Sequence, residues 1–114
     1  MSKGFELLVE SGTKALNQIK NYKEVARKVK RIVDTFLTGS RVYVFGSVTK
    51  GRQTAMSDID ILIVVDGVTR DQVYEVEAKI YSTIDAPIEL HVASNEEFNC
   101  WYSKFIDKLE EIGS

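Results

Sequence analysis

Residues 46–60 read GSVTKGRQTAMSDID, and this stretch joins two apolar runs of the chain. The run before it, residues 42–45, consists of β-branched and aromatic residues, which favour a strand. Gly46 ends that run, because a glycine lets the backbone turn sharply. The run after it, residues 59–65, is almost wholly apolar and stops at Asp66-Gly67, as is typical of a central strand buried on both faces. The stretch therefore predicts two strands and a turn between them.

The residues that follow Gly46 have the composition of a phosphate-binding turn. Residues 47–50 are long enough for a single helical turn, whose first backbone N–H groups would point back toward the sheet edge and attract phosphate oxygens. The Ser47 hydroxyl can add a donor, and Lys50 and Arg52 place positive charge close by. The candidate phosphate-binding residues are therefore Gly46, Ser47, Lys50 and Arg52.

Two aspartates open the second strand. Asp58 and Asp60 occupy alternate positions, so their side chains share one face and their Cα atoms lie roughly 6 to 7 Å apart. Carboxylates at that separation can converge on one Mg²⁺, which prefers oxygen ligands and is commonly held by one or two carboxylates together with substrate phosphates. Gly-Ser and Asp-x-Asp are each common structural features. The complete spacing, however, arises by chance in roughly one chain of this length in several hundred, so the whole pattern predicts a site.

The same residues resemble the Gly-Ser-x10-Asp-x-Asp signature of the DNA polymerase beta-like nucleotidyltransferase superfamily, in its minimal, MNT-type form. The resemblance covers about residues 22–110. It implies an α/β (α+β) fold with a small mixed β-sheet of about three to five strands flanked by helices. It also implies a third carboxylate on a neighbouring strand, which acts with the metal ions or as the base for the attacking hydroxyl.

Residues 87–93, PIELHVA, are the natural place for that third carboxylate. Apolar residues alternate here with Glu89 and His91, so one face of the predicted strand is apolar and the other carries an acid and an imidazole. Glu89 is the preferred candidate, although the family more often has Asp at this position. Asp85 is the alternative, but it lies in a connection where a turn role is more common. His91 could contact substrate. A histidine in such a position is, however, more commonly a half-exposed strand residue without a function.

The resemblance implies a reaction as well as a site. ATP would bind with its phosphates on the Gly46-Ser47 turn, and Mg²⁺, as two ions, would be held by the catalytic candidates Asp58, Asp60 and Glu89. An acceptor hydroxyl would attack the α-phosphorus, and pyrophosphate would leave. Minimal nucleotidyltransferases are typically paired with a small helical HEPN toxin, and some transfer AMP onto its tyrosine, as antitoxins of toxin–antitoxin systems. Two alternatives remain open: nucleotidyl transfer to a small hydroxylated molecule, and a non-catalytic antitoxin that masks its partner by contact.

The length of the chain limits what one molecule can hold. With 114 residues, 44% of them hydrophobic, the chain can bury one core. We therefore expect a single nucleotidyltransferase domain over residues 1–114, in which the helical segment 1–20 could lie at the periphery. An acceptor would then come from a partner protein or lie across a homodimer interface.

No stretch is apolar enough to span a bilayer and the start lacks a signal peptide, so we expect a cytoplasmic protein. The single cysteine, Cys100, excludes an internal disulfide.

Helices are predicted near residues 5–19, 22–37, 70–82 and 95–112, the first two from apolar residues at helical intervals. The last two begin at sequences typical of capping boxes, Thr69-x-x-Gln72 and Ser94-x-x-Glu97. The last helix would carry a broad apolar face that includes Trp101 and Tyr102. Core packing and a partner interface explain that face equally well.

Charge is unevenly distributed although the net charge is only −2. Residues 1–52 carry 11 Lys and Arg against 4 acidic residues, whereas residues 53–114 carry 4 against 13. The helix at 22–37 is notably basic, which indicates a solvated face or, less commonly, a docking surface for an acidic partner or an RNA backbone. Few aromatic residues interleave with these cations, so a dedicated nucleic-acid reader is not expected.

Overall fold

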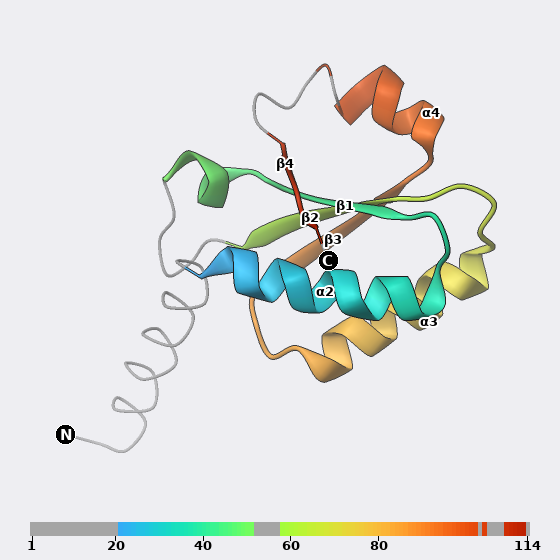
Figure 1. Ribbon diagram of the computed structural model, residues 1–114, viewed down its shortest axis with the longest axis horizontal. Coiled ribbons are helices and arrows are strands. Elements are labelled where there is room, and N and C mark those ends of the chain that lie inside the picture. The colour runs from blue at the N-terminus through green and yellow to red at the C-terminus, as the bar shows by residue number, and fades with distance from the viewer. Residues whose placement is uncertain (1–20, 52–57, 103, 105–108, 114) are drawn as a thin grey trace.

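The computed structural model describes residues 21–51, 58–102, 104 and 109–113 (Figure 1). Its elements are, in chain order, α2 (Tyr22–Phe36), β1 (Arg41–Phe45), the 3-10 helix η1 (Ser47–Lys50), β2 (Ile59–Val64), α3 (Arg70–Thr83), β3 (Ile88–Ala93), α4 (Asn95–Glu97), the π-helical segment η2 (Phe98–Tyr102) and β4 (Glu110–Glu111). The helix predicted at residues 5–19 lies outside the described residues. None of the helices within the described ranges is long and apolar enough to cross a membrane.

The strands form one mixed sheet in the order β3-β2-β1-β4. β1 is antiparallel to both β2 and β4, and β2 is parallel to β3. β2 lies inside the sheet and five of its six residues are buried, which confirms the prediction of a central strand. The predicted fold class, a small mixed sheet flanked by helices, is also confirmed.

Helices cover the two faces of this sheet unequally (Figure 1). α2 and α3 lie side by side on one face, where their apolar side chains build the main core with alternate residues of β1, β2 and β3. α4 and η2 lie on the opposite face. A smaller cluster there joins Tyr43, Leu62, Val64 and Ala93 of the sheet to Phe98 and Tyr102 of η2. The sheet therefore has a main-core face and an α4 face.

Both long helices form for reasons that are visible in the sequence. Val25, Val29 and Val33 recur at helical intervals and form the buried stripe of α2. α3 begins at the predicted capping box, in which the Thr69 hydroxyl accepts a hydrogen bond from the Gln72 N–H and the Gln72 side chain accepts one from the Thr69 N–H. Local capping and apolar periodicity therefore fix the helices of the main-core face.

The helix predicted over residues 95–112 is wrong at its C-terminal end. Its capping box at Ser94 is present and the helix continues as the π-helical segment η2 to Tyr102, but Glu110–Glu111 form a strand. Without this strand the outer edge of β1 would lack partners for its backbone groups. β4 supplies them by pairing with Tyr43 and Val44, and the Ile112 N–H donates to the Val42 carbonyl at 2.8 Å. The Ile112 side chain is buried in the main core, so pairing and burial together override the helical periodicity.

Candidate functional site

The candidate carboxylates lie where β1, β2 and β3 run side by side. Asp60 of β2 is paired with Phe45 of β1 on one side and with Glu89 of β3 on the other. Asp60 alternates with Ile59 and Ile61, which face the main core. The Asp60 and Glu89 side chains therefore both project from the α4 face of the sheet.

His91 joins this pair of acids. Its Nε2 atom lies 3.7 Å from Asp60 Oδ1 and 3.9 Å from Glu89 Oε1. One ligand atom from each of Asp60, Glu89 and His91 lies within 4.8 Å of the other two. We call these three residues the carboxylate–imidazole group. Its side chains are graded in exposure, with 22% of Asp60, 30% of His91 and 56% of Glu89 accessible, so the group opens to solvent on the Glu89 side.

The environment of Asp60 makes its negative charge unfavourable. Burial raises the pKa of its carboxyl above the ordinary value, and a hydrogen bond and the charge of Glu89 raise it further. His91 lowers the pKa in part. A cation placed between the carboxylates would counter both raising effects, because it replaces lost solvation and screens the two like charges. The carboxylate oxygens are also the donors that a hard cation such as Mg²⁺ prefers.

Gly46 contacts the same carboxylate from the end of β1. Its φ of +85° lies in the left-handed region that favours glycine. A Cβ atom built on Gly46 would lie 2.2 Å from Asp60 Oδ2, far inside van der Waals contact. Only a residue without a side chain lets the two segments approach so closely. The Gly-Ser half of the motif and the Asp-x-Asp half are therefore in direct contact.

The turn after Gly46 is anchored in the protein. The Gly46 carbonyl accepts hydrogen bonds from the Thr49 N–H at 3.2 Å and from the Thr49 hydroxyl at 2.9 Å. The side chains of Val48 and Thr49 are buried. The helical turn expected at residues 47–50 is confirmed as η1. The side chains of Ser47 and Lys50 and the whole of Arg52 lie outside the described part of the chain, so their phosphate contacts stay predictions.

Asp58 is placed just before β2 and its side chain is exposed. The next residue, Ile59, donates its N–H to the Pro87 carbonyl at 2.7 Å, which fixes the start of β2 beside the start of β3. Asp58 is not one of the three residues whose ligand atoms gather, and neither is Asp85, which is exposed ahead of β3. A shared ion at Asp58 and Asp60 therefore stays a prediction.

The structure places His91 beside Asp60 and Glu89, whereas the sequence left its role open. Its Nε2 atom is buried and has no hydrogen-bond partner. The ring of Phe45 packs against its imidazole, with 5.2 Å between ring centroids. The signal in the sequence was the alternation that puts Glu89 and His91 on one face. What the sequence lacked was the register, which sets His91 opposite Leu62 and thus beside Asp60.

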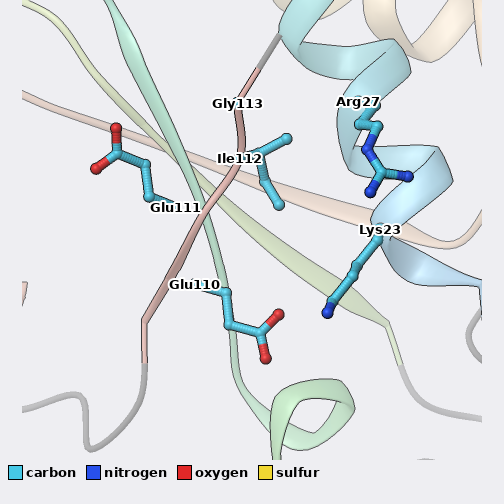
Figure 2. A pocket seen from close by; sticks show the side chains of 6 residues that line it. All are labelled: Lys23, Arg27, Glu110, Glu111, Ile112 and Gly113. Atoms are coloured by element: carbon cyan, nitrogen blue, oxygen red, sulfur yellow. The ribbon is translucent and has the colours of Figure 1, made fainter.

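The basic helix α2 forms a separate pocket of about 340 Å³ with β4. Figure 2 shows Lys23 and Arg27 of α2 beside β4, with the Lys23 side chain pointing toward the Glu110 carboxylate and the Glu111 side chain pointing away from α2. Two ion pairs also lie along the helix, Arg27 with Glu24 and Lys30 with Asp34. Acidic side chains thus offset part of the positive charge of α2, which favours the interpretation of a solvated helix face.

Comparison with known proteins gives a family for this fold and site. Residues 23–112 match the model of the nucleotidyltransferase domain family, and this range includes every candidate site residue. No curated protein matches the chain significantly.

Two solved structures are similar to the chain. One is a crystal structure of a provisionally assigned nucleotidyltransferase, 27% identical with a TM-score of 0.63, in which the alignment covers 76% of this chain and 96% of that one. The other is a provisionally assigned nucleotidyltransferase from Sulfolobus solfataricus, solved at 1.40 Å resolution. It is 22% identical with a TM-score of 0.53, over 90% of this chain and 83% of that one, and it supports the fold alone.

Proposed function

Because the chain belongs to the nucleotidyltransferase domain family, we propose that it transfers AMP from ATP to a hydroxyl group on a partner protein of the HEPN toxin class. The observation that carries the proposal is the contact of Gly46 with the Asp60 carboxylate, beside Glu89 on the next strand. This contact sets a turn suited to phosphates against a pair of acids suited to a cation. A nucleoside triphosphate with its metal ion matches both halves.

In the proposed reaction an oxygen of the acceptor hydroxyl attacks the α-phosphorus of ATP in line with the bond to the β-phosphate. The new bond joins the acceptor oxygen to the α-phosphorus, the bond from the α-phosphorus to the bridging oxygen breaks, and pyrophosphate leaves. Mg²⁺, held by Asp58, Asp60 and Glu89, would neutralise charge on the phosphates. Either a second metal ion or the half-exposed Glu89 carboxylate, acting as the base, would help to remove the acceptor's proton. The protein mainly positions the reactants, as is usual in phosphoryl-type transfer.

A partner as acceptor is supported by what surrounds the acids. In the part of the chain that the structure describes, the elements build one sheet with its covering helices, and no second lobe stands beside Glu89. The open side of the carboxylate–imidazole group faces solvent. A hydroxyl presented by another protein can reach Glu89 from that side. The HEPN class, and the antitoxin role that goes with it, follow from the resemblance of residues 46–60.

The test uses ATP labelled at one phosphate at a time, with Mg²⁺ and the HEPN protein as acceptor. We expect label from the α-phosphate to appear on the HEPN protein, and none from the γ-phosphate. Asp60→Asn and Asp58→Asn should abolish labelling, whereas Glu96→Gln, which removes an exposed acid of α4, should not. Transfer of the γ-label would contradict nucleotidyl transfer. Labelling that survives Asp60→Asn would remove Asp60 from the reaction, and neutralisation of the partner without any labelling would refute catalysis in favour of masking by contact.

A further inference from the structure

We propose that His91 is a direct ligand of the metal ion at the carboxylate–imidazole group, and that the site consequently prefers first-row transition-metal ions to Mg²⁺. The proposal rests on the proposed function only in taking a divalent ion to be present. It assigns a role to a side chain outside the Gly-Ser and Asp-x-Asp motif. It also predicts an ion preference that carboxylates alone would not give.

The Nε2 atom of His91 has no other use in the described structure. It is buried and makes no hydrogen bond, although buried polar atoms in folded proteins are almost always paired. Its distances of 3.7 Å to Asp60 Oδ1 and 3.9 Å to Glu89 Oε1 are too long for hydrogen bonds. The imidazole therefore points at both acids without bonding to either.

Those distances suit three ligands of one ion. With metal–ligand bonds of about 2.1 Å, adjacent ligand atoms of an octahedral ion lie about 3 Å apart and opposite ones about 4.2 Å apart. The separations from Nε2, 3.7 and 3.9 Å, lie less than about 1 Å from either value. Bonding to one ion would satisfy the unpaired nitrogen and place a positive charge between the two carboxylates. All three residues stand on the neighbouring strands β2 and β3.

The ring of His91 is held in place for this role. β3 is paired with β2 along its whole length, with His91 opposite Leu62, and the Phe45 ring packs against the imidazole. Phe45 in turn contacts Tyr102 of η2, with 6.5 Å between ring centroids. A ligand on a paired strand, supported by two aromatic rings, loses little freedom on binding an ion.

Imidazole nitrogen is what distinguishes this donor set chemically. Mg²⁺ favours oxygen donors and gains little from a nitrogen, whereas affinity of a mixed nitrogen and oxygen site rises from Mn²⁺ through Co²⁺. Asp60 and Glu89 by themselves would suit Mg²⁺. The addition of His91 shifts the preference toward transition-metal ions, so Mn²⁺, Co²⁺ or Zn²⁺ should bind more tightly than Mg²⁺.

The first experiment uses the unaltered chain and needs no catalysis. Because the protein has one histidine, ¹⁵N-histidine labelling of untagged protein gives NMR signals from His91 alone. We expect one equivalent of Zn²⁺ to shift the Nε2 signal strongly, and pulsed EPR of the Mn²⁺-loaded chain to show coupling to a directly bound nitrogen. An Nε2 signal that Zn²⁺ leaves in place, or Mn²⁺ without nitrogen coupling, would overturn the proposal.

The second experiment measures affinity by calorimetry with Co²⁺ alone and Mg²⁺ alone. In His91→Gln, Co²⁺ affinity should fall about tenfold or more, while Mg²⁺ affinity changes less than about threefold. Glu96→Gln is the matched control and should bind both ions as the unaltered chain does. Equal loss of both ions in His91→Gln would instead make His91 a support for the carboxylates and refute direct ligation. These assays contain no nucleotide, so a failure of AMP transfer leaves their outcome unaffected.

Discussion

Gly46→Ala tests the contact that brings the two halves of the motif together. Two separate penalties follow from the structure. The φ of +85° is unfavourable for any residue with a Cβ, by about 1–2 kcal/mol. The new Cβ would also lie 2.2 Å from Asp60 Oδ2 and 3.2 Å from its Cγ, so the carboxylate must move about 1 Å to reach van der Waals contact. Overpacking of this kind costs about 1–3 kcal/mol, which gives a total of about 2–5 kcal/mol.

Two other glycines supply matched controls for the first penalty. Gly39 and Gly67 have φ of +75° and +69°, and a Cβ at either position meets nothing within 4 Å. Gly39→Ala and Gly67→Ala should therefore each lose only about 1–2 kcal/mol. Urea unfolding followed by circular dichroism measures all three variants on one scale. If Gly46→Ala loses no more stability than these controls, the contact with Asp60 is not as the structure has it.

A double variant isolates the second penalty. Asp60→Ala removes the oxygen and Cγ that collide, and the remaining Asp60 Cβ lies at an ordinary 3.5 Å. In that background Gly46→Ala should cost only as much as Gly39→Ala, so the two substitutions should couple by about 1–3 kcal/mol. Additive losses would refute the reasoning. In the otherwise unaltered chain, displacing Asp60 by about 1 Å should also lower nucleotidyl transfer by about a hundredfold.

Three further predictions test the site and the elements that support it. Because folding raises the pKa of Asp60, the stability that this carboxyl contributes is present below the ordinary pKa of 3.8 and is lost as the pH rises through the raised folded value. In metal-free buffer at neutral pH, Asp60→Asn should therefore raise the urea midpoint, and it should flatten the dependence of that midpoint on pH. An unchanged midpoint would contradict this prediction. Thr69→Ala removes half of the α3 capping box and should lower stability by about 0.5–2 kcal/mol, whereas a loss below the error of urea unfolding would show that the cap is not formed in solution. Ile80→Ala leaves a cavity at a fully buried position of the main core and should lower the free energy of unfolding by about 2–5 kcal/mol. Lys79→Ala, at an exposed position of α3, is the control in the same urea unfolding assay and should change the free energy of unfolding little.

Features that depend on short stretches of sequence were predictable. The apolar runs at 42–45 and 59–65 gave β1 and β2, and the capping box at Thr69 gave the start of α3. The spacing of Gly46, Asp58 and Asp60 indicated the family, which the match over residues 23–112 confirms. Each of these signals lies within a few residues of the element that it specifies. The family pattern also pointed to Glu89, which the structure places next to Asp60.

The features that the sequence missed depend on contacts between distant segments. The C-terminal end of the helix predicted at 95–112 was overridden because Glu110 and Glu111 complete the free edge of β1 and Ile112 fills the main core. Alternation along residues 87–93 could not place His91 beside Asp60, because it shows which face of the strand a residue occupies but not which residue of the neighbouring strand lies next to it.

The sequence by itself thus determined the chemistry of the chain, because donor type and spacing follow from which residues stand close together along it. Only the tertiary structure decided which groups share one site. The parallel register of β2 and β3 brings His91 to Asp60, and the turn at the end of β1 presses Gly46 against the same carboxylate. The physical reason is that strand register is fixed by burial over the whole sheet, so a contact between residues 31 positions apart has no local signature.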